Sequence, residues 1–436
     1  MQQHTYSRIR AVSSILLLVC GILLVGSVAV AATDSTQARK VTSPPKDAGD
    51  YLLAIPAFAL RIPVWVLEGV ATGPVVMAEQ SSLPFTLQRL FAFDVPWGVY
   101  PIFGYKSRTG LMLGAAYHSR DFARTRIPLL VKGTYSTNTY RYIAARIGDR
   151  KMFDSPYGIA FDIGWRADTR ERFYGLGPSS SLDNSSNYGF RGMFGGVTAY
   201  REFARRGEVS ISGGLRKIDP EDGRLQTITH DRDSIAAELP GEDLYGLFET
   251  LDLHDVIATI SYDWRERPSS PLGGGTAGLN VGYTFGEGLG DTSVGYWRVH
   301  GEATHFFELF NGRVIGFSLI AEHVDPDEVT RIPFYDLPKL GGSRLLRGYK
   351  TGRFRDLGFV SFAAEYRWPL LRKLDALLMT DHGRVFHEIT QDFEFSNFRA
   401  SYGGGLRFWN DAGHLSLMVA KGTEEWSFYI NFGDSF

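Results

Sequence analysis

The chain has 436 residues, with 46 lysines and arginines against 48 aspartates and glutamates, so its formal net charge is −2. This balance argues against a nucleic-acid-binding protein, which would carry a basic surface, and 22% charged residues are too many for a bundle of membrane-spanning helices. A hydrophobic content of 44% excludes a chain that is disordered throughout. The 49 glycines and the 14% aromatic residues are high counts, typical of a transmembrane β-barrel.

Residues 1–31 have the pattern of a secretory signal peptide. A basic start precedes an apolar run over 15–30, and residues 29–31 read Ala-Val-Ala, a small-residue cleavage site. The alternatives are a membrane anchor, for which the run is short, and a lipoprotein attached at Cys20, for which Val19 is not the expected small residue. Because Cys20 is the only cysteine, we expect the mature chain to enter an oxidising compartment without disulfides.

Residues 32–96 differ from the rest of the chain and are predicted to form a periplasmic or interfacial helical leader. Residues 33–50 are polar, contain two adjacent prolines and read as flexible chain. Within 51–93, apolar stretches broken by proline and glycine indicate short amphipathic helices, too short to span a membrane. They are expected to lie on the periplasmic membrane face or to enter the barrel lumen. A plug with only a packing role is an equal alternative.

From Trp97 onward, apolar and polar residues alternate in segments of roughly ten residues separated by turn residues, as in transmembrane β-strands. The pattern predicts an all-β fold, a sixteen-stranded antiparallel transmembrane β-barrel over 97–436, which follows the short helical segments. An even number of strands is expected for a single-chain bacterial barrel. The predicted strands are 98–105, 110–119, 127–137, 140–149, 157–167, 187–203, 206–217, 254–265, 274–286, 294–308, 314–324, 357–368, 373–386, 400–409, 413–421 and 425–434.

The two faces of the predicted strands differ in polarity. In 357–368, Phe362 and Tyr366 share one face, and Glu365 and Arg367 share the other. Both charge signs on one face fit a water-filled lumen. With the N-terminus in the periplasm, long connections would be extracellular and short ones periplasmic, which is the bacterial pattern. The long extracellular connections would include 168–186, 218–253, 325–356 and 387–399.

The chain ends in a strand that is expected to act as an assembly signal. Trp426, Phe428, Ile430 and Phe432 alternate on one face, and the last residue is Phe436. An apolar edge strand is an aggregation hazard in a soluble protein, whereas assembly machinery in the outer membrane would bind it by strand addition. We therefore expect that machinery to be a partner for the insertion of this chain; the alternative is a strand of a soluble protein.

Three segments resemble motifs of one known family. Residues 340–349 read Leu-Gly-Gly-Ser-Arg-Leu-Leu-Arg-Gly-Tyr and resemble the GG…RG(F/Y) loop motif of the BamA/TamA (bacterial surface antigen) superfamily. In that family the motif lies between strands eleven and twelve, as it does in the strand prediction above. Residues 378–383 resemble the D-x-G motif of strand thirteen, and 262–274 resemble the turn between strands eight and nine. Weaker resemblances lie at 172–177 and 365–369.

The resemblance implies a loop lock, formed by Arg347, Gly348, Tyr349, Asp381 and Gly383. In this lock the long loop folds back into the lumen, and the planar guanidinium of Arg347 donates two hydrogen bonds to Asp381. Gly348 would allow a close approach of the backbone, and Tyr349 would pack against the wall. A purely structural role is expected over a direct chemical one. Family members that handle polypeptide clients carry POTRA domains before the barrel, and this chain is expected to lack them.

A weak seam is expected where the first strand meets the last. Pro101 has no N–H to donate, Gly104 weakens the first strand further, and Gly433 does the same near the chain end. We predict fewer hydrogen bonds across this seam than between other strands, which would allow lateral opening or pairing with a client. The last strand would contribute Phe428, Ile430 and Phe432.

No catalytic site, metal site or cofactor is predicted. The ten histidines show no ligand spacing and no G-x-S-x-G motif is present, so an enzyme is not expected. Acidic residues within 219–233 indicate a solvated surface that faces lipopolysaccharide rather than a cation site.

The sequence thus predicts a barrel of the bacterial outer membrane that works in the insertion or translocation of protein or lipid. Its expected partners are outer-membrane lipids, lipopolysaccharide and periplasmic proteins, and no nucleic acid. The alternative is a passive diffusion channel or a surface-exposed structural barrel. The loop at 325–356 separates the two, because a loop that fills the lumen would keep passive conductance small.

Overall fold

The computed structural model describes residues 97–432 with short interruptions. The interruptions are 107–109, 138–139, 225–234, 236–244, 269, 288–292, 328–329, 372, 389–393, 395–396 and 411–412. The predicted signal peptide, the predicted helical leader, Gly433 and Phe436 lie outside the described residues, so the predictions made for them remain predictions.

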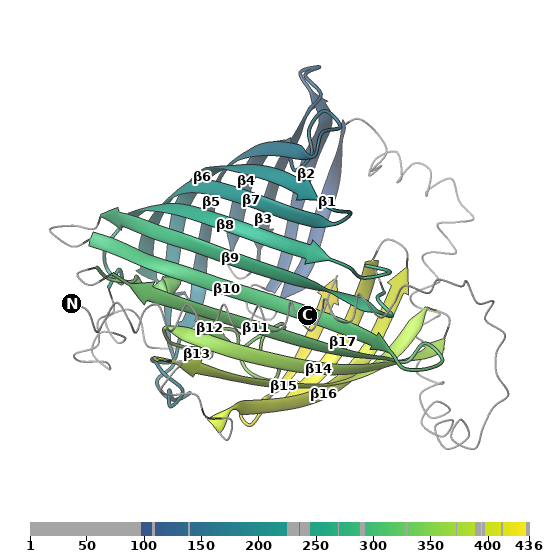
Figure 1. Ribbon diagram of the computed structural model, residues 1–436. Helices are drawn as coiled ribbons and strands as arrows, with labels where there is room; N and C mark the ends of the chain where they lie inside the picture. Colours follow the sequence, from purple (N-terminus) through teal and green to yellow (C-terminus); the bar gives the residue numbers. More distant parts are fainter. Residues whose placement is uncertain are drawn as a thin grey trace, which may run out of the picture.

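Within the described residues, sixteen strands form one antiparallel sheet, in which each strand pairs with its neighbours along the chain. Figure 1 shows the sheet curled on itself, from the purple strand β1 to the yellow C-terminal strands. The all-β prediction and the number of strands are confirmed. The strands of the sheet are β1 (Trp97–Lys106), β2 (Gly110–Phe122), β3 (Ile127–Ser136), β4 (Arg141–Asp149), β5 (Tyr157–Phe173), β6 (Ser186–Phe203), β7 (Gly207–Asp222), β8 (Leu251–Asp263), β9 (Gly274–Glu287), β10 (Ser293–Glu308), β11 (Val314–Pro326), β14 (Gly358–Leu371), β15 (Leu374–Phe386), β16 (Arg399–Asn410), β17 (Gly413–Lys421) and β18 (Trp426–Phe432).

Side chains alternate between an apolar outer surface and a polar inner surface. On β5, Ile163 is 62% exposed, and on β14, Phe362 is 38% exposed. The neighbours of Phe362 on the opposite face, Ser361 and Ala363, are buried, as is Glu365. Exposed aliphatic and aromatic side chains outside, with buried charges inside, are the reverse of a soluble sandwich and fit a wall that faces lipid.

The largest differences from the predicted strand ends are in β5 and β7. β5 continues to Phe173 and β7 to Asp222, where the prediction placed their ends at 167 and 217. The added residues remain paired, for example Phe173 with Ser186 and Asp222 with Tyr188. Apart from Phe173, Ile218 and Pro220 they are polar, so the apolar alternation that marks a lipid-facing strand stops before the backbone ladder does.

The wall is uneven in height. β5, β6 and β7 contain 17, 18 and 16 residues. β17 and β18 contain 9 and 7 residues. The tall strands and the short strands lie in different parts of the sheet, with β8 to β16 between them.

The long connection between β11 and β14 lies against the inner side of the sheet. It contains a 3-10 turn, η1 (Phe334–Asp336), and two short strands, β12 (Lys339–Leu340) and β13 (Phe354–Arg355), which pair with each other. Residues of β12 and β13 contact β14 and β15, and Figure 1 shows both next to these strands. We call residues 343–349 the loop tip.

Two apolar clusters hold this connection in place. One joins the loop to the wall at the level of β12 and comprises Ile320, Leu340, Leu346, Tyr349, Phe354, Phe359 and Val385. The other lies at the end of the barrel that carries the long connections and joins η1 to β5, β6, β7, β8, β10 and β11. Its aromatic members are Phe173, Tyr188, Tyr245, Tyr296, Phe334 and Tyr335. Burial of this apolar surface anchors the loop inside the barrel.

β1 and β18 are the two edge strands of the sheet. Some of their Cα atoms lie within 8 Å of each other, but no ladder pairs the two strands in the part of the chain that the structure describes. Among the same residues, no helix has both the length and the apolar character needed to cross a membrane.

Candidate functional site

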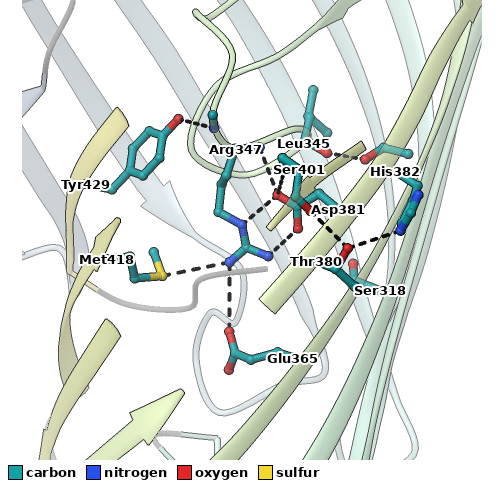
Figure 2. Close-up of polar contacts among 12 residues, drawn as sticks. Ser318, Leu345, Arg347, Glu365, Thr380, Asp381, His382, Ser401, Met418 and Tyr429 are labelled. Atoms are coloured by element: carbon teal, nitrogen blue, oxygen red, sulfur yellow. Dashed lines mark hydrogen bonds and ion pairs between the residues drawn. The ribbon is translucent and has the colours of Figure 1, made fainter. Parts of the chain in front are cut away.

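Arg347 of the loop tip is bound to Asp381 on the inner face of β15. Its Nε donates to Asp381 Oδ2 at 2.8 Å, its Nη2 to Oδ1 at 2.5 Å and its backbone N–H to Oδ2 at 2.8 Å. The hydroxyl of Ser401 on β16 donates to Oδ2 at 3.5 Å. Figure 2 shows the guanidinium and the carboxylate side by side. Since one carboxylate accepts from both the backbone and the side chain of Arg347, it fixes the position and the orientation of the loop tip.

The guanidinium also approaches a second carboxylate. Glu365 Oε2 on β14 lies 3.9 Å from Arg347 Nη1, and the sulfur of Met418 on β17 lies 3.8 Å from the same nitrogen. Burial lowers the pKa of Arg347, but Asp381 and then Glu365 outweigh burial, so that pKa lies above its ordinary value. Arg347, Asp381 and Glu365 are each only 1% exposed. Removal of Asp381 would therefore leave a buried guanidinium with only the more distant Glu365 to compensate its charge.

Glu365 extends this charged group toward the opposite end of the lumen. Its Oε1 lies 3.4 Å from Nε of Arg367, also on the inner face of β14. Arg367 Nη2 donates to the carbonyl of Pro271 at 2.8 Å, and the guanidinium of Arg367 lies 5.0 Å from the centre of the Phe306 ring. Pro271 belongs to the turn between β8 and β9. A continuous chain of charged side chains thus connects all three segments that resemble family motifs.

Gly348 allows the loop tip to touch the hairpin between β17 and β18. Its φ is +81°, and a Cβ at this position would lie 2.3 Å from the backbone nitrogen of Gly422, so a side chain does not fit. The backbone N–H of Gly348 donates to the hydroxyl of Tyr429 on β18 at 3.0 Å. The loop tip is therefore hydrogen-bonded to the edge strand as well as to β15.

Tyr349 is buried in the cluster at the level of β12. Its hydroxyl donates to the carbonyl of Ala400 on β16 at 3.3 Å and lies 3.0 Å from Thr423 Oγ1 in the β17–β18 hairpin. Tyr349 thus bridges the wall and the hairpin.

Gly383 provides space for the loop. A Cβ at Gly383 would lie 3.1 Å from both terminal carbons of Leu340, which is fully buried. Directly opposite Gly383 on β14, the hydroxyl of Ser361 donates to the carbonyl of Leu345. The D-x-G segment therefore supplies an acceptor for Arg347 and room for β12.

A second charged group holds the loop at η1. Asp336 lies 3.1 Å from Nη2 of Arg216 on β7 and accepts a hydrogen bond from Tyr296 on β10 at 2.7 Å. Arg298 Nη2 on β10 donates to the Asp336 carbonyl at 2.5 Å. Burial raises the pKa of Asp336, but Arg216 and Arg298 outweigh it and hold that pKa well below its ordinary value. The carboxylate is thus ionised in the folded protein.

The predicted seam residues lie on the two edge strands. Pro101 and Gly104 are in β1, opposite Ala115 and Met112 of β2. Phe428 is 56% exposed on the outer surface of β18. Ile430 and Phe432 are paired with Leu417 and Leu415 of β17. Lateral opening between β1 and β18 remains a prediction.

Several residues of the site were not singled out from the sequence. Glu365 and Arg367 were placed on the lumen face, but their contacts with Arg347 and Pro271 depend on a loop whose path no periodicity reveals. Tyr429 and Met418 sit in strands as alternating residues, with no signal that they meet the loop tip. Only the register of their strands, which places both side chains on the inner face, could have suggested these contacts.

Comparisons with known proteins identify the family. The sequence matches the model of the Omp85 superfamily domain over residues 129–436. No curated protein sequence matches the chain. Among solved structures, it is similar to BamA from Haemophilus ducreyi lacking POTRA domains 1–3, with 15% identity over 77% of this chain and 69% of that chain and a TM-score of 0.57.

Two CdiB structures are also similar. CdiB from Escherichia coli has 15% identity over 77% of this chain and 62% of that chain, with a TM-score of 0.48. CdiB from Acinetobacter baumannii has 14% identity over 77% of this chain and 59% of that chain, with a TM-score of 0.45. This chain thus spans less than two thirds of either CdiB chain. Because the family model covers well over half of the sequence, the protein belongs to the Omp85 superfamily and is an outer-membrane β-barrel of the BamA/TamA type, as the loop motif predicts.

Proposed function

We propose that this outer-membrane protein inserts or translocates polypeptides by receiving them at the seam between β1 and β18. The observation that carries the proposal is the pair of edge strands, which lie close together but share no ladder in the described residues. Unpaired backbone N–H and C=O groups on an edge strand can form a ladder with an added strand. A client strand would therefore find donors and acceptors at this place on the wall.

The position of the loop supports the seam, rather than the lumen, as the route of the polypeptide. The connection between β11 and β14 is bound inside the barrel at Arg347 and at η1, and the cluster around Phe334 and Tyr335 lies at the end that carries the long connections. A cavity of about 470 Å³ between the loop and the wall is lined by charged residues that include Arg298, Glu302 and Glu322. Such a filled interior is poorly suited to free diffusion of solutes.

The proposal includes no covalent chemistry, and we infer that the protein is not an enzyme. It includes the outer-membrane assembly machinery as the partner that inserts this barrel, and outer-membrane lipids and lipopolysaccharide as its surroundings. Periplasmic proteins would deliver the clients.

The test is cross-linking to a client during insertion into lipid vesicles. Phe428→Cys places a thiol on the outer surface of β18, and Val256→Cys places one on the outer surface of β8, where the native side chain is 51% exposed. The client is an unfolded outer-membrane barrel protein with one cysteine in its first strand. We expect vesicles with the protein to accelerate folding of the client, and we expect a disulfide to form with position 428 but not with 256.

Planar-bilayer conductance tests the alternative function, that of a diffusion channel. A large ohmic conductance, with no acceleration of client folding and equal cross-linking at both positions, would overturn the proposal and favour a diffusion channel.

A further inference from the structure

Arg353 lies deep among three connections that are far apart in the sequence. It follows the loop tip in the connection between β11 and β14 and is 3% exposed. Its Nε lies 2.8 Å from Glu424 Oε2, and its Nη2 lies 2.8 Å from Glu424 Oε1. Its Nη1 donates to the Ser180 hydroxyl at 2.9 Å, and its Nη2 donates to the Ser180 carbonyl at 2.7 Å. We call Arg353, Glu424 and Ser180 the outer clamp.

The outer clamp uses the full donor set of a guanidinium. Three nitrogens reach a carboxylate on one side and a serine on the other, while the flat faces lie 5.2 Å from the ring centre of Tyr174 and 4.5 Å from that of Phe354. A lysine ammonium is a compact point charge and could not make this forked and stacked arrangement. The geometry therefore selects arginine.

Glu424 belongs to the short hairpin that leads from β17 into the edge strand β18. Ser180 belongs to the connection between β5 and β6, on the tall part of the wall. Arg353 thus ties the beginning of β18 to a connection on a distant part of the barrel. A neighbouring pair, Lys350 and Glu425, also joins the loop to the hairpin, but it is 3.6 Å apart and both side chains are 36% exposed. Exposed pairs of this kind contribute little.

We infer that Arg353 is a positioning residue that holds β18 in place from the end of the barrel that carries the long connections. The seam opens only when the ion pair between Arg353 and Glu424 breaks, so this step limits the rate of opening. The inference rests on the proposed function, because it assigns a control point to the same seam. It does not involve the loop lock, since Arg353 contacts neither Arg347 nor Asp381 in any hydrogen bond or ion pair found among the described residues.

The experiment compares two single substitutions in the same hairpin. Glu424→Gln removes the charge that Arg353 binds, and Glu425→Gln is the matched control in the exposed pair. Hydrogen exchange followed by mass spectrometry reports on the hairpin and β18 in lipid nanodiscs. We expect Glu424→Gln to raise the exchange rate of these amides by at least about tenfold, the loss of a charged hydrogen bond, and Glu425→Gln to change it by less than about twofold.

The second measurement is the rate of client folding in vesicles, with the heat-induced gel shift as a check that the barrel is intact. We expect faster client folding with Glu424→Gln and no change with Glu425→Gln, while both variants keep the heat-induced gel shift of a folded barrel. A merely structural role would slow client folding instead. If Glu424→Gln does not fold, Ser180→Ala, which removes one hydrogen bond of the clamp, is measured in the same way and should show the same direction of change.

The outcomes separate the two proposals. Unchanged exchange in Glu424→Gln, or faster exchange without faster client folding in a protein whose native form folds clients, would overturn the inference. If the native protein folds no client at all, the proposed function fails, and the exchange rates alone still decide whether Arg353 holds β18.

Discussion

Asp381 illustrates how one side chain can determine the path of a long loop. It accepts three hydrogen bonds from a single residue, Arg347, and both groups are shielded from water. Charged groups in such surroundings depend strongly on each other, because the one that remains after a substitution has lost its nearest partner and is shielded from water.

We therefore predict that Asp381→Asn lowers the free energy of unfolding by about 3 kcal/mol. The matched control is Arg344→Gln in the same loop tip, whose pair with Glu302 is 2.7 Å apart but 57% and 38% exposed, so it should cost less than about 1 kcal/mol. Urea unfolding in lipid vesicles measures both. Equal midpoints for the two variants would contradict the importance assigned to the buried pair.

Gly348 should tolerate no side chain. With φ at +81° and the backbone of Gly422 at 2.3 Å from the site of a Cβ, Gly348→Ala is expected to destabilise the protein by at least about 1 kcal/mol. Gly213→Ala is the control, because a Cβ there has no atom within 4 Å. The heat-induced gel shift of the two variants compares them, and an unchanged shift for Gly348→Ala would show that the loop tip can move away from the hairpin.

Asp336 should make the stability of the docked loop depend on pH. Its pKa is lowered in the folded protein by Arg216 and Arg298, so its contribution is complete above its ordinary pKa of about 4 and is lost as the pH falls below that value. The measurement is the difference in urea midpoint between the native protein and Asp336→Asn at pH 7 and at pH 3. We expect a clear difference at pH 7 that shrinks at pH 3, and a constant difference would contradict this assignment.

At the scale of the strands, backbone pairing sets local stability. Each inner strand has ladders on both sides, whereas β1 and β18 have one in the described residues. Local opening requires the loss of fewer hydrogen bonds at such edges. We predict faster amide exchange in β1 and β18 than in β6, measured in nanodiscs at neutral pH. Equal protection of β18 and β6 would show that the two edges are joined by a ladder.

The strands were the part of the structure that the sequence revealed most directly. Alternation such as that of Phe362 and Glu365 depends only on which face of a strand meets lipid, so it can be recognised from a short stretch of sequence. The ends of β5 and β7 near the long connections were not predicted, because their residues are mostly polar and apolar side chains no longer alternate there. The path of the loop was inferred only through resemblance, on Arg347 and Asp381. The outer clamp could not be inferred, because Ser180, Arg353 and Glu424 meet only after the whole sheet has curled.

For the whole molecule, the interior is a packed and charged compartment. The loop lock, η1 and the outer clamp each bind the same connection to a different part of the wall. This explains how one chain segment with almost no regular structure keeps a defined place inside a wide barrel.

We predict that the native protein conducts little current in a planar bilayer and that deletion of residues 341–350 raises the conductance severalfold. The deletion removes the loop tip but leaves β11, β14 and the cluster around Phe334 in the chain. Low conductance in both forms would mean that other parts of the protein close the lumen.

The uneven height of the wall has a consequence for the surrounding lipid. The 18 residues of β6, at about 3.3 Å each and tilted by about 45°, span about 42 Å, more than the apolar band of about 25 Å that outer-membrane barrels usually present. The neighbouring strands β5 and β7, with 17 and 16 residues, exceed this band as well. This side of the wall therefore projects beyond the hydrocarbon. We expect molecules that approach from the end of the long connections to meet this projecting rim before they reach the lipid.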